Sequence, residues 1–373
     1  MADVSRRPLL FLFLEIFNQE GGIQTYNKDL FGEYLQLESC PKADVFLLRD
    51  RRTKHNPFEQ KHLQFHYFQS ASAKLGRLWF AIAAFSYAVK HRPQRIFCGH
   101  LKLARLTQFI GQTLNLPYTV MTYGKEVWEP LSMSDREALV HADQIWTVSR
   151  HTRDRTCQVN QLNPNRFRLL PCAVDGDVFV PGEKSGPLIQ RYGLEQSKVL
   201  LTVARLWSGD IYKGVDVTIR ALPKILSAVP AVKYLVIGRG DDQPRLAQLA
   251  EDLGVSDRVV FAGFVPTEQL VDHYRLADGY VMPSQEGFGV VYLEAMACGI
   301  PVIAGDNDGS TDPLQDGQVG WHVPHRDSDA VADACIQLLK GHDQRCDSSW
   351  IREQTLAGFG KLAFRKTLAT LLS

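Results

Sequence analysis

The stretch that decides the fold is PSQEGFGVVYLEAMACGIP, residues 283–301. An apolar strand is expected to end at Met282, because Pro283 cannot continue it. A loop with two glycines follows, and the pattern then predicts a helix over residues 290–298. Glycines just before a helix let a backbone come close to an anion, since free N–H groups and the helix dipole point toward it. The stretch therefore predicts a strand–loop–helix unit with an anion-binding turn.

Two carboxylates frame this turn. Glu286 lies in the loop and Glu294 lies inside the expected helix, eight positions later. Carboxylates are poor ligands for phosphate but good acceptors for sugar hydroxyls. The turn thus combines donors for a diphosphate with acceptors for hydroxyls, which favours a nucleotide-sugar site. The alternative is an ordinary strand–loop–helix unit with both glutamates in water.

Residues 286–304 closely resemble the Glu-x7-Glu signature of retaining GT-B glycosyltransferases, specifically glycosyltransferase family 4. The resemblance implies an α/β chain of the GT-B type, with two Rossmann-like, doubly wound parallel-sheet domains facing a cleft. It also implies transfer of a sugar from a nucleoside-diphosphate donor to a hydroxyl with retention of anomeric configuration. The resemblance is strong over residues 200–325 and patchy over the N-terminal half.

The pattern along the chain agrees with two such domains. Apolar strands alternate with helical stretches in both halves, and 373 residues suit two α/β domains. The turn-rich segment 181–187 reads as a linker. We predict an N-terminal acceptor-binding domain over 1–180 and a nucleotide-sugar-binding domain over 181–350. The resemblance implies that the terminal helix, 351–373, crosses back to the first domain.

A departing diphosphate needs either a metal ion or fixed cations. Arg205 follows an expected strand, and Lys213 precedes the expected helix 215–226. This pair matches the family's diphosphate-binding pair, although a surface Arg and Lys are the alternative. The patterns Asp175-Gly-Asp177 and Asp306-Asn-Asp308 also fit metal-using transferases, but loops favour Asp in any case. We therefore expect no metal and no cofactor, the nucleotide sugar being a substrate.

The remaining site residues are carried over from the family. Glu286 would bind the donor sugar, Glu294 the ribose hydroxyls, and Gly263, Phe264 and Val265 would lie along the base. The catalytic set is Arg205, Lys213, Glu286 and Tyr123. The other donor-binding positions share backbone groups near the two glycine loops: Gly21, Gly22, Gly287, Phe288, Gly289, Val290 and Val291.

The first half supplies acceptor-side candidates at strand ends. His100 ends one expected strand, and Tyr123 with Lys125 and Glu126 follows another. Family members usually carry His where this chain has Tyr123. Tyr donates a hydrogen bond but does not titrate near neutral pH, so proton transfer at this position is in doubt. His62 and His66 are spaced to share a helix face, but no third metal ligand accompanies them.

Net charge and cysteine content limit the compartment and the partners that we expect for the protein. Net charge is +1, with 23 Lys+Arg against 17 Asp+Glu in residues 1–180. A basic first half suits an anionic acceptor or peripheral contact with a membrane surface, although a solvated face is equally compatible. The helix expected over 75–89 is too short to span a bilayer and is expected in the core rather than on a membrane. Seven scattered cysteines fit the reducing cytoplasm, with no nucleic-acid partner suggested.

The sequence therefore predicts a cytoplasmic, metal-independent, retaining hexosyltransferase acting on a saccharide or lipid-linked glycan. An epimerase or a phosphorylase with a GT-B-like fold remains an alternative. So does a non-catalytic nucleotide-sugar-binding subunit, which the Tyr123 substitution motivates.

Overall fold

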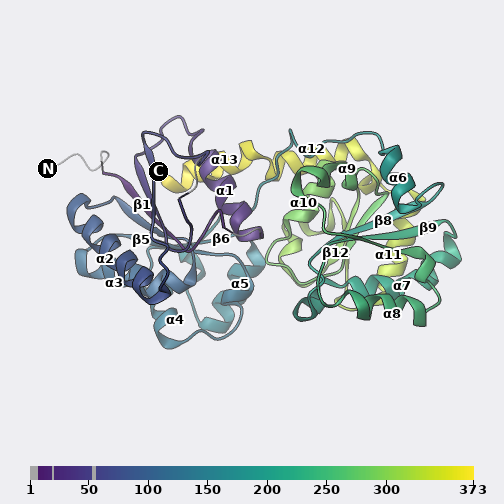
Figure 1. Cartoon of the computed structure of the whole chain (residues 1–373), viewed down its shortest axis with the longest axis horizontal. Coiled ribbons are helices and arrows are strands. Elements are labelled where there is room, and N and C mark those ends of the chain that lie inside the picture. Colours follow the sequence, from purple (N-terminus) through teal and green to yellow (C-terminus); the bar gives the residue numbers. More distant parts are fainter. Residues whose placement is uncertain (1–6, 19–20, 53–55) are drawn as a thin grey trace. The chain divides into compact units, whose positions relative to one another are not determined.

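The computed structural model describes residues 7–18, 21–52 and 56–373 (Figure 1). Two compact units make up the chain: Met1–Cys172 with Phe364–Ser373, and Ala173–Ala363. The two units divide after Cys172, and Phe364–Ser373 of the C-terminal stretch groups with the first unit. Helix α12 (Ser348–Phe359) stays with the second unit because it packs on α10 (Val290–Ala297).

The first unit holds a parallel sheet with the order β3-β2-β1-β4-β5-β6-β7. Its strands are β1 (Leu9–Phe13), β2 (Ala43–Leu47), β3 (Leu63–Tyr67), β4 (Arg95–Cys98), β5 (Tyr118–Thr122), β6 (Gln144–Thr147) and β7 (Phe167–Leu169). Its helices are α1 (Gly22–Tyr34), α2 (Ala73–His91), α3 (Ala104–Leu114), α4 (Met133–Val140), α5 (Arg150–Asn160) and α13 (Lys361–Leu372).

Strand β1 shows why this sheet is covered on both faces. All five of its residues are buried, and successive side chains point to opposite faces. Leu10 and Leu12 join the core on the side of α2, α3 and α4. Phe11 and Phe13 pack instead on Phe31 of α1, with ring centroids 5.4 and 5.6 Å away. Figure 1 shows α1 and α13 on one side of this sheet and α2 and α3 on the other.

The second unit holds a parallel sheet with the order β10-β9-β8-β11-β12-β13. Its strands are β8 (Lys198–Val203), β9 (Val232–Ile237), β10 (Val259–Gly263), β11 (Gly279–Met282), β12 (Val302–Gly305) and β13 (Trp321–Val323). Its other helices are α6 (Gly186–Tyr192), α7 (Val215–Ala228), α8 (Gln243–Asp252), α9 (Leu270–Tyr274) and α11 (Ser328–Lys340). Helices α7, α8 and α11 share one apolar core with the sheet.

Each sheet has a point at which the strand order reverses. In the first unit β1 lies between β2 and β4, and in the second β8 lies between β9 and β11. Open α/β sheets bind ligands at the carboxyl ends of the strands beside such a point. The loops after β8 and β11 are therefore the expected ligand position in the second unit. They contain Arg205, Lys213 and Glu286, and Glu294 lies in α10, which follows the second loop.

One local prediction is wrong. His62 and His66 do not share a helix face, because β3 contains His66 and begins just after His62. The apolar alternation of the segment joins it to the sheet edge, where His66 Nε2 lies 2.6 Å from Asp44 Oδ1. Among the described residues, no helix combines the length and the apolar character that a membrane-crossing segment requires.

Candidate functional site

The loop after β8 carries the two predicted cations. Arg205 is largely exposed, and its Nη2 lies 2.8 Å from Oδ2 of the buried Asp210. Neighbouring segments fix this loop: Leu206 N donates to the Arg239 carbonyl at 3.1 Å, and Ser208 N donates to Asp241 Oδ1 at 2.9 Å. The loop therefore holds an exposed guanidinium at the carboxyl edge of the sheet through contacts within the protein.

Lys213 and Glu286 form an ion pair that joins the loops after β8 and β11. Lys213 Nζ donates to Glu286 Oε1, and each side chain is only 17% exposed. A charge pair this buried is costly to break, because removing one partner leaves the other charge poorly solvated. The structure thus brings together two predicted catalytic residues that lie 73 positions apart in the chain.

Glycine is required where these two loops approach. Gly214 has φ +75°, and a Cβ there would lie 2.5 Å from the Pro283 carbonyl oxygen. Gly289 has φ +89° at the start of α10, and a Cβ there would lie 2.2 Å from the Tyr292 ring. Both positions favour glycine by conformation and by space. They let Lys213 reach Glu286 and leave the first N–H groups of α10, from Val290 and Val291, without capping by a side chain.

Asp308 anchors the loop that carries Glu286. Its Oδ2 accepts from Glu286 N at 2.6 Å, and its Oδ1 accepts from Ser310 N at 2.8 Å. Burial raises the pKa of Asp308 to about 7, although the hydrogen bonds from Ser310 and Glu286 oppose the shift. The carboxylate oxygens are thus turned toward this loop. In the described part of the chain no three His, Cys, Asp or Glu side chains converge as a metal site would need.

Glu294 faces a buried tyrosine. Tyr274 Oη donates to Glu294 Oε2 at 2.6 Å. Burial raises the pKa of Glu294, and this hydrogen bond opposes the shift. Tyr274 therefore fixes one carboxylate oxygen of Glu294. The role of Glu294 in binding hydroxyl groups stays a prediction.

The segment predicted to lie along a base ends β10. Gly263 has φ +74°, and a Cβ there would meet no atom within 4 Å, so open space borders its backbone. Phe264 is 50% exposed, with the Arg239 guanidinium 4.7 Å from its ring centroid. Val265 is buried. Of the three, the open backbone at Gly263 and the ring of Phe264 are accessible to a ligand of this unit.

In the first unit, Tyr123 points into the protein. Its hydroxyl lies 2.9 Å from the Gly99 carbonyl oxygen and 3.2 Å from Asn27 Oδ1, and the residue is 9% exposed. Burial raises the pKa of the phenol well above its ordinary value. The hydroxyl joins α1 to the ends of β4 and β5. These contacts fit a positioning role for Tyr123. Its hydroxyl proton is donated to groups within the first unit.

The acceptor-side candidates are also engaged locally. Glu126 Oε1 accepts from Tyr123 N at 2.5 Å, and burial raises the pKa of Glu126. His100 Nδ1 accepts from Lys102 N at 3.1 Å, and burial with the nearby Lys102 and Arg49 charges lowers the pKa of His100 to about 4. His100 is therefore neutral at neutral pH. Lys125 is exposed on the same turn.

Gly22 leaves space at the start of α1. A Cβ at Gly22, the first residue of α1, would meet no atom within 4 Å. Gly21 precedes it in extended conformation, and no side chain caps the helix. Of the two glycines, only Gly22 has this space among the described residues, because a Cβ at Gly21 would lie 2.8 Å from Gln24 Oε1. Donor binding by this turn stays a prediction.

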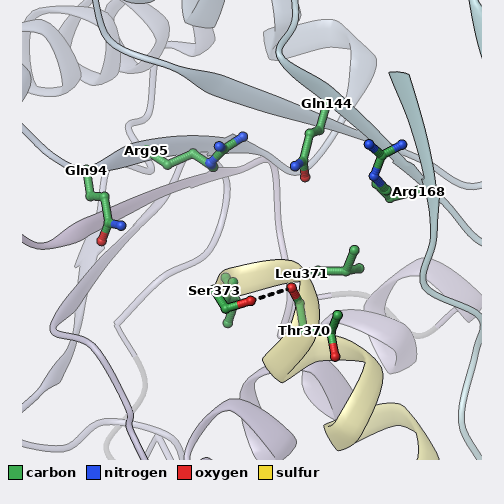
Figure 2. Close-up of a pocket in the computed structure, with 8 residues that line it drawn as sticks. Gln94, Arg95, Gln144, Arg168, Thr370, Leu371 and Ser373 are labelled. Carbon is green, nitrogen blue, oxygen red and sulfur yellow. Dashed lines mark hydrogen bonds between the residues drawn. The ribbon is translucent and has the colours of Figure 1, made fainter. Parts of the chain in front are cut away.

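A cavity of about 340 Å³ lies at the opposite edge of the first sheet, away from these loops. Figure 2 shows Arg95, Gln144 and Arg168, from the strands, above the end of α13. Arg95 and Gln144 are the first residues of β4 and β6, and Arg168 is the second residue of β7. Open α/β sheets carry their principal site at the carboxyl ends of the strands and not at this end. None of the predicted site residues lines it.

Sequence reasoning missed three contributors to the second-unit site. Asp210 pairs with Arg205, Tyr274 orients Glu294, and Asp308 was considered only as a metal ligand. Their partners are distant in the chain, so spacing could not reveal them. The Asp-Asn-Asp-Gly pattern at 306–309 was the one available signal, because such residues hydrogen-bond nearby backbone.

The two doubly wound sheets, with cations and carboxylates at a switch point, define the GT-B class of nucleotide-sugar enzymes. Solved structures agree in fold along nearly the whole chain: Anabaena HepE in complex with UDP has a TM-score of 0.78 at 20% identity, covering 98% of this chain and 99% of that one. Sucrose-phosphate synthase from Thermosynechococcus elongatus has a TM-score of 0.74 at 23% identity, covering 98% of each. The predicted GT-B fold is confirmed.

Residues 197–341 match the family described as Glycosyl transferases group 1. A GDP-mannose-dependent alpha-(1-6)-phosphatidylinositol monomannoside mannosyltransferase of Mycobacterium tuberculosis is 35% identical over 282 residues, 72% of this chain and 67% of that enzyme. The enzyme of the same name from Mycolicibacterium smegmatis is 37% identical over 233 residues, 58% of this chain and 59% of its own length. The chain belongs to the group 1 glycosyl transferases, which confirms the family resemblance.

Proposed function

We propose that the chain is a retaining hexosyltransferase that moves a sugar from a nucleoside diphosphate to a hydroxyl of a saccharide or lipid-linked glycan. The observation that carries this proposal is the Lys213–Glu286 pair beside Arg205 at the switch point of the second sheet. Cations there meet the diphosphate, and the carboxylate meets the hydroxyls of the sugar. The relatives named for GDP-mannose make GDP-mannose the first donor to test.

The leaving diphosphate gains negative charge as the glycosidic bond breaks. Lys213, Arg205 and the N–H groups that begin α10 are preorganised to stabilise that charge, so we propose that no metal ion is needed. In the proposed mechanism the acceptor attacks on the same face from which the diphosphate leaves, and the leaving phosphate takes the acceptor proton. Such a mechanism needs no dedicated general base, which agrees with the inward orientation of Tyr123 and the local engagement of Glu126.

Thermal unfolding tests donor binding. The chain is heated with GDP, UDP or ADP and with GDP-mannose, UDP-glucose or ADP-glucose, each with and without a chelator. Binding to the folded state raises its stability by about 2.7 kcal/mol at a ligand concentration of 100 Kd. We expect a rise with one base only, unchanged by the chelator. No rise with any nucleotide would overturn the proposal, and a rise abolished by the chelator would overturn metal independence.

Product analysis separates the alternatives. Incubating the identified donor with simple glycosides and recording the anomeric proton coupling by NMR reports retention or inversion, and an inverted product would contradict the proposed mechanism. Sugar-nucleotide conversion without acceptor would indicate an epimerase, and sugar release that depends on phosphate would indicate a phosphorylase. Donor binding without turnover over a broad acceptor set would indicate a binding subunit.

A further inference from the structure

Helix α2 exposes an apolar stripe on the first unit. The stripe consists of side chains between about one half and two thirds exposed: Leu75 53%, Leu78 58%, Trp79 65%, Ile82 50% and Val89 49%. These positions follow the i, i+3, i+4, i+7 spacing, so they lie on one face of the helix. We call this face the α2 stripe. Isolated exposed apolar residues are ordinary, but four within two turns of one helix, with Val89 on the same face two turns later, mark an interaction surface.

The opposite face of α2 is firmly seated, so the stripe cannot turn inward. Phe80 is buried and packs on Phe68, with ring centroids 5.4 Å apart. Tyr87 Oη donates to Asp44 Oδ2 of β2 at 2.5 Å. These contacts fix the rotation of the helix about its axis. The sequence-based expectation of a core helix therefore holds for one face only.

The part of the sequence that contains α2 carries positive charge. Residues 60–125 contain nine Lys or Arg and no Asp or Glu. On α2 itself Lys74, Arg77 and Lys90 are exposed, and among the described residues none of the three forms an ion pair. Acidic groups come from neighbouring elements: Asp44 accepts from Tyr87 and His66, and Asp135 of α4 pairs with Arg105 of α3. The face around the stripe is thus apolar and cationic.

We infer that the α2 stripe docks on an anionic lipid surface. Aliphatic side chains and a tryptophan on one face with lysine and arginine around them are the composition of a helix that lies in a membrane interface. Anionic lipid supplies the charge that this face lacks. A second copy of the chain fits less well, because a self-complementary contact would bring cationic faces together without acidic partners.

This inference rests on the proposed function in one respect: an acceptor carried on lipid would be presented at the surface on which α2 docks. The basic first half of the chain allowed membrane contact in general terms. The structure assigns that contact to one helix face, defined by Leu78, Trp79 and Ile82 at its centre.

Vesicle flotation tests the inference with the full chain. The probes are vesicles of phosphatidylcholine alone and of phosphatidylcholine with phosphatidylglycerol, at low and high salt. We expect binding to the anionic vesicles only, weakened by salt because exposed charges are screened. Absence of binding to anionic vesicles at low salt would overturn the inference.

Variants assign the surface. The triple variant Leu78→Gln/Trp79→Gln/Ile82→Gln is expected to bind anionic vesicles at least tenfold more weakly than the unaltered chain. Its matched control replaces three exposed apolar side chains elsewhere: Met133→Gln/Val178→Gln/Leu362→Gln, which are 79%, 50% and 59% exposed. A second variant, Lys74→Glu/Arg77→Glu, keeps the stripe and reverses charge, so it should lose the anionic preference.

A nucleotide-dependent rise in unfolding temperature, measured on the same variants, separates this inference from the proposed function. It should be unchanged in the triple variant, because the α2 stripe lies in the first unit and the loops after β8 and β11, with Arg205, Lys213 and Glu286, lie in the second. Equal vesicle binding by the triple variant and the control would overturn the inference. It would also be overturned if the unaltered chain self-associated without binding vesicles and the triple substitution converted it to a monomer. Failure of nucleotide binding in the unaltered chain would instead overturn the proposed function.

Discussion

Replacing Lys213 by methionine should lower both activity and stability, for two separable reasons. The substitution keeps most of the buried side-chain volume and removes the cation beside the expected leaving group. Loss of one preorganised donor costs about 2.7–4 kcal/mol of transition-state stabilisation, which is roughly a 10²–10³-fold fall in kcat. Glu286 also loses its partner. Breaking a fully buried pair costs about 3–5 kcal/mol, and the partial exposure of both side chains reduces our expectation to about 1–3 kcal/mol.

The double variant Lys213→Met/Glu286→Gln distinguishes the two effects. Without either charge it should recover most of the lost free energy of unfolding, while kcat stays low because the cation is still missing. Urea unfolding measures the first quantity, and steady-state turnover with the donor identified by thermal unfolding measures the second. Lys224→Met, at an exposed ion pair on α7, is the control and should change neither. A fall in kcat of less than tenfold in Lys213→Met would refute the assigned role.

Three further substitutions test the architecture of the two units. For Asp308, a pKa of about 7 in the folded chain against 3.8 unfolded means that the folded state binds more protons between pH 4 and 7. Its contribution to the free energy of unfolding should therefore fall by up to about 4 kcal/mol as pH rises through that window, and Asp308→Asn should remove this slope in urea unfolding. An unchanged slope would contradict the shift. Gly214→Ala should destabilise the chain more than Gly254→Ala, because both have positive φ but only Gly214 has backbone atoms in the space of the new Cβ; equal midpoints of urea unfolding would argue against that close approach. Tyr123→His should retain turnover if the residue only positions its neighbours, and an abolished rate with intact folding and donor binding would show that the phenol itself is needed.

The local pattern predicted most of the fold because it reports burial directly. In the sequence, a parallel strand covered on both faces appears as a continuous apolar run, as in β1. An amphipathic helix appears as apolar residues that recur with the helical period. The same reasoning failed at His66, since the weak alternation around it is compatible with a short helix or an edge strand.

The candidate site was predicted in its components. Arg205, Lys213, Glu286 and Glu294 follow strand ends or begin helices, so their position at one edge of a sheet could be expected from the alternation alone. Their pairing could not. Whether Lys213 meets Glu286 depends on β8 and β11 being neighbours in the sheet, which the chain order does not state.

The sequence by itself determined the fold class, the family and the residue types at the candidate site, because strand–helix periodicity and a long motif are properties of contiguous residues. Only the tertiary structure decided which charges pair, which hydroxyls turn inward and which apolar side chains remain outside. Tyr123 and the stripe around Trp79 show this most plainly. Tyr123 and Trp79 are both aromatic positions in the sequence, and their opposite orientations follow from what the neighbouring strands and helices leave uncovered.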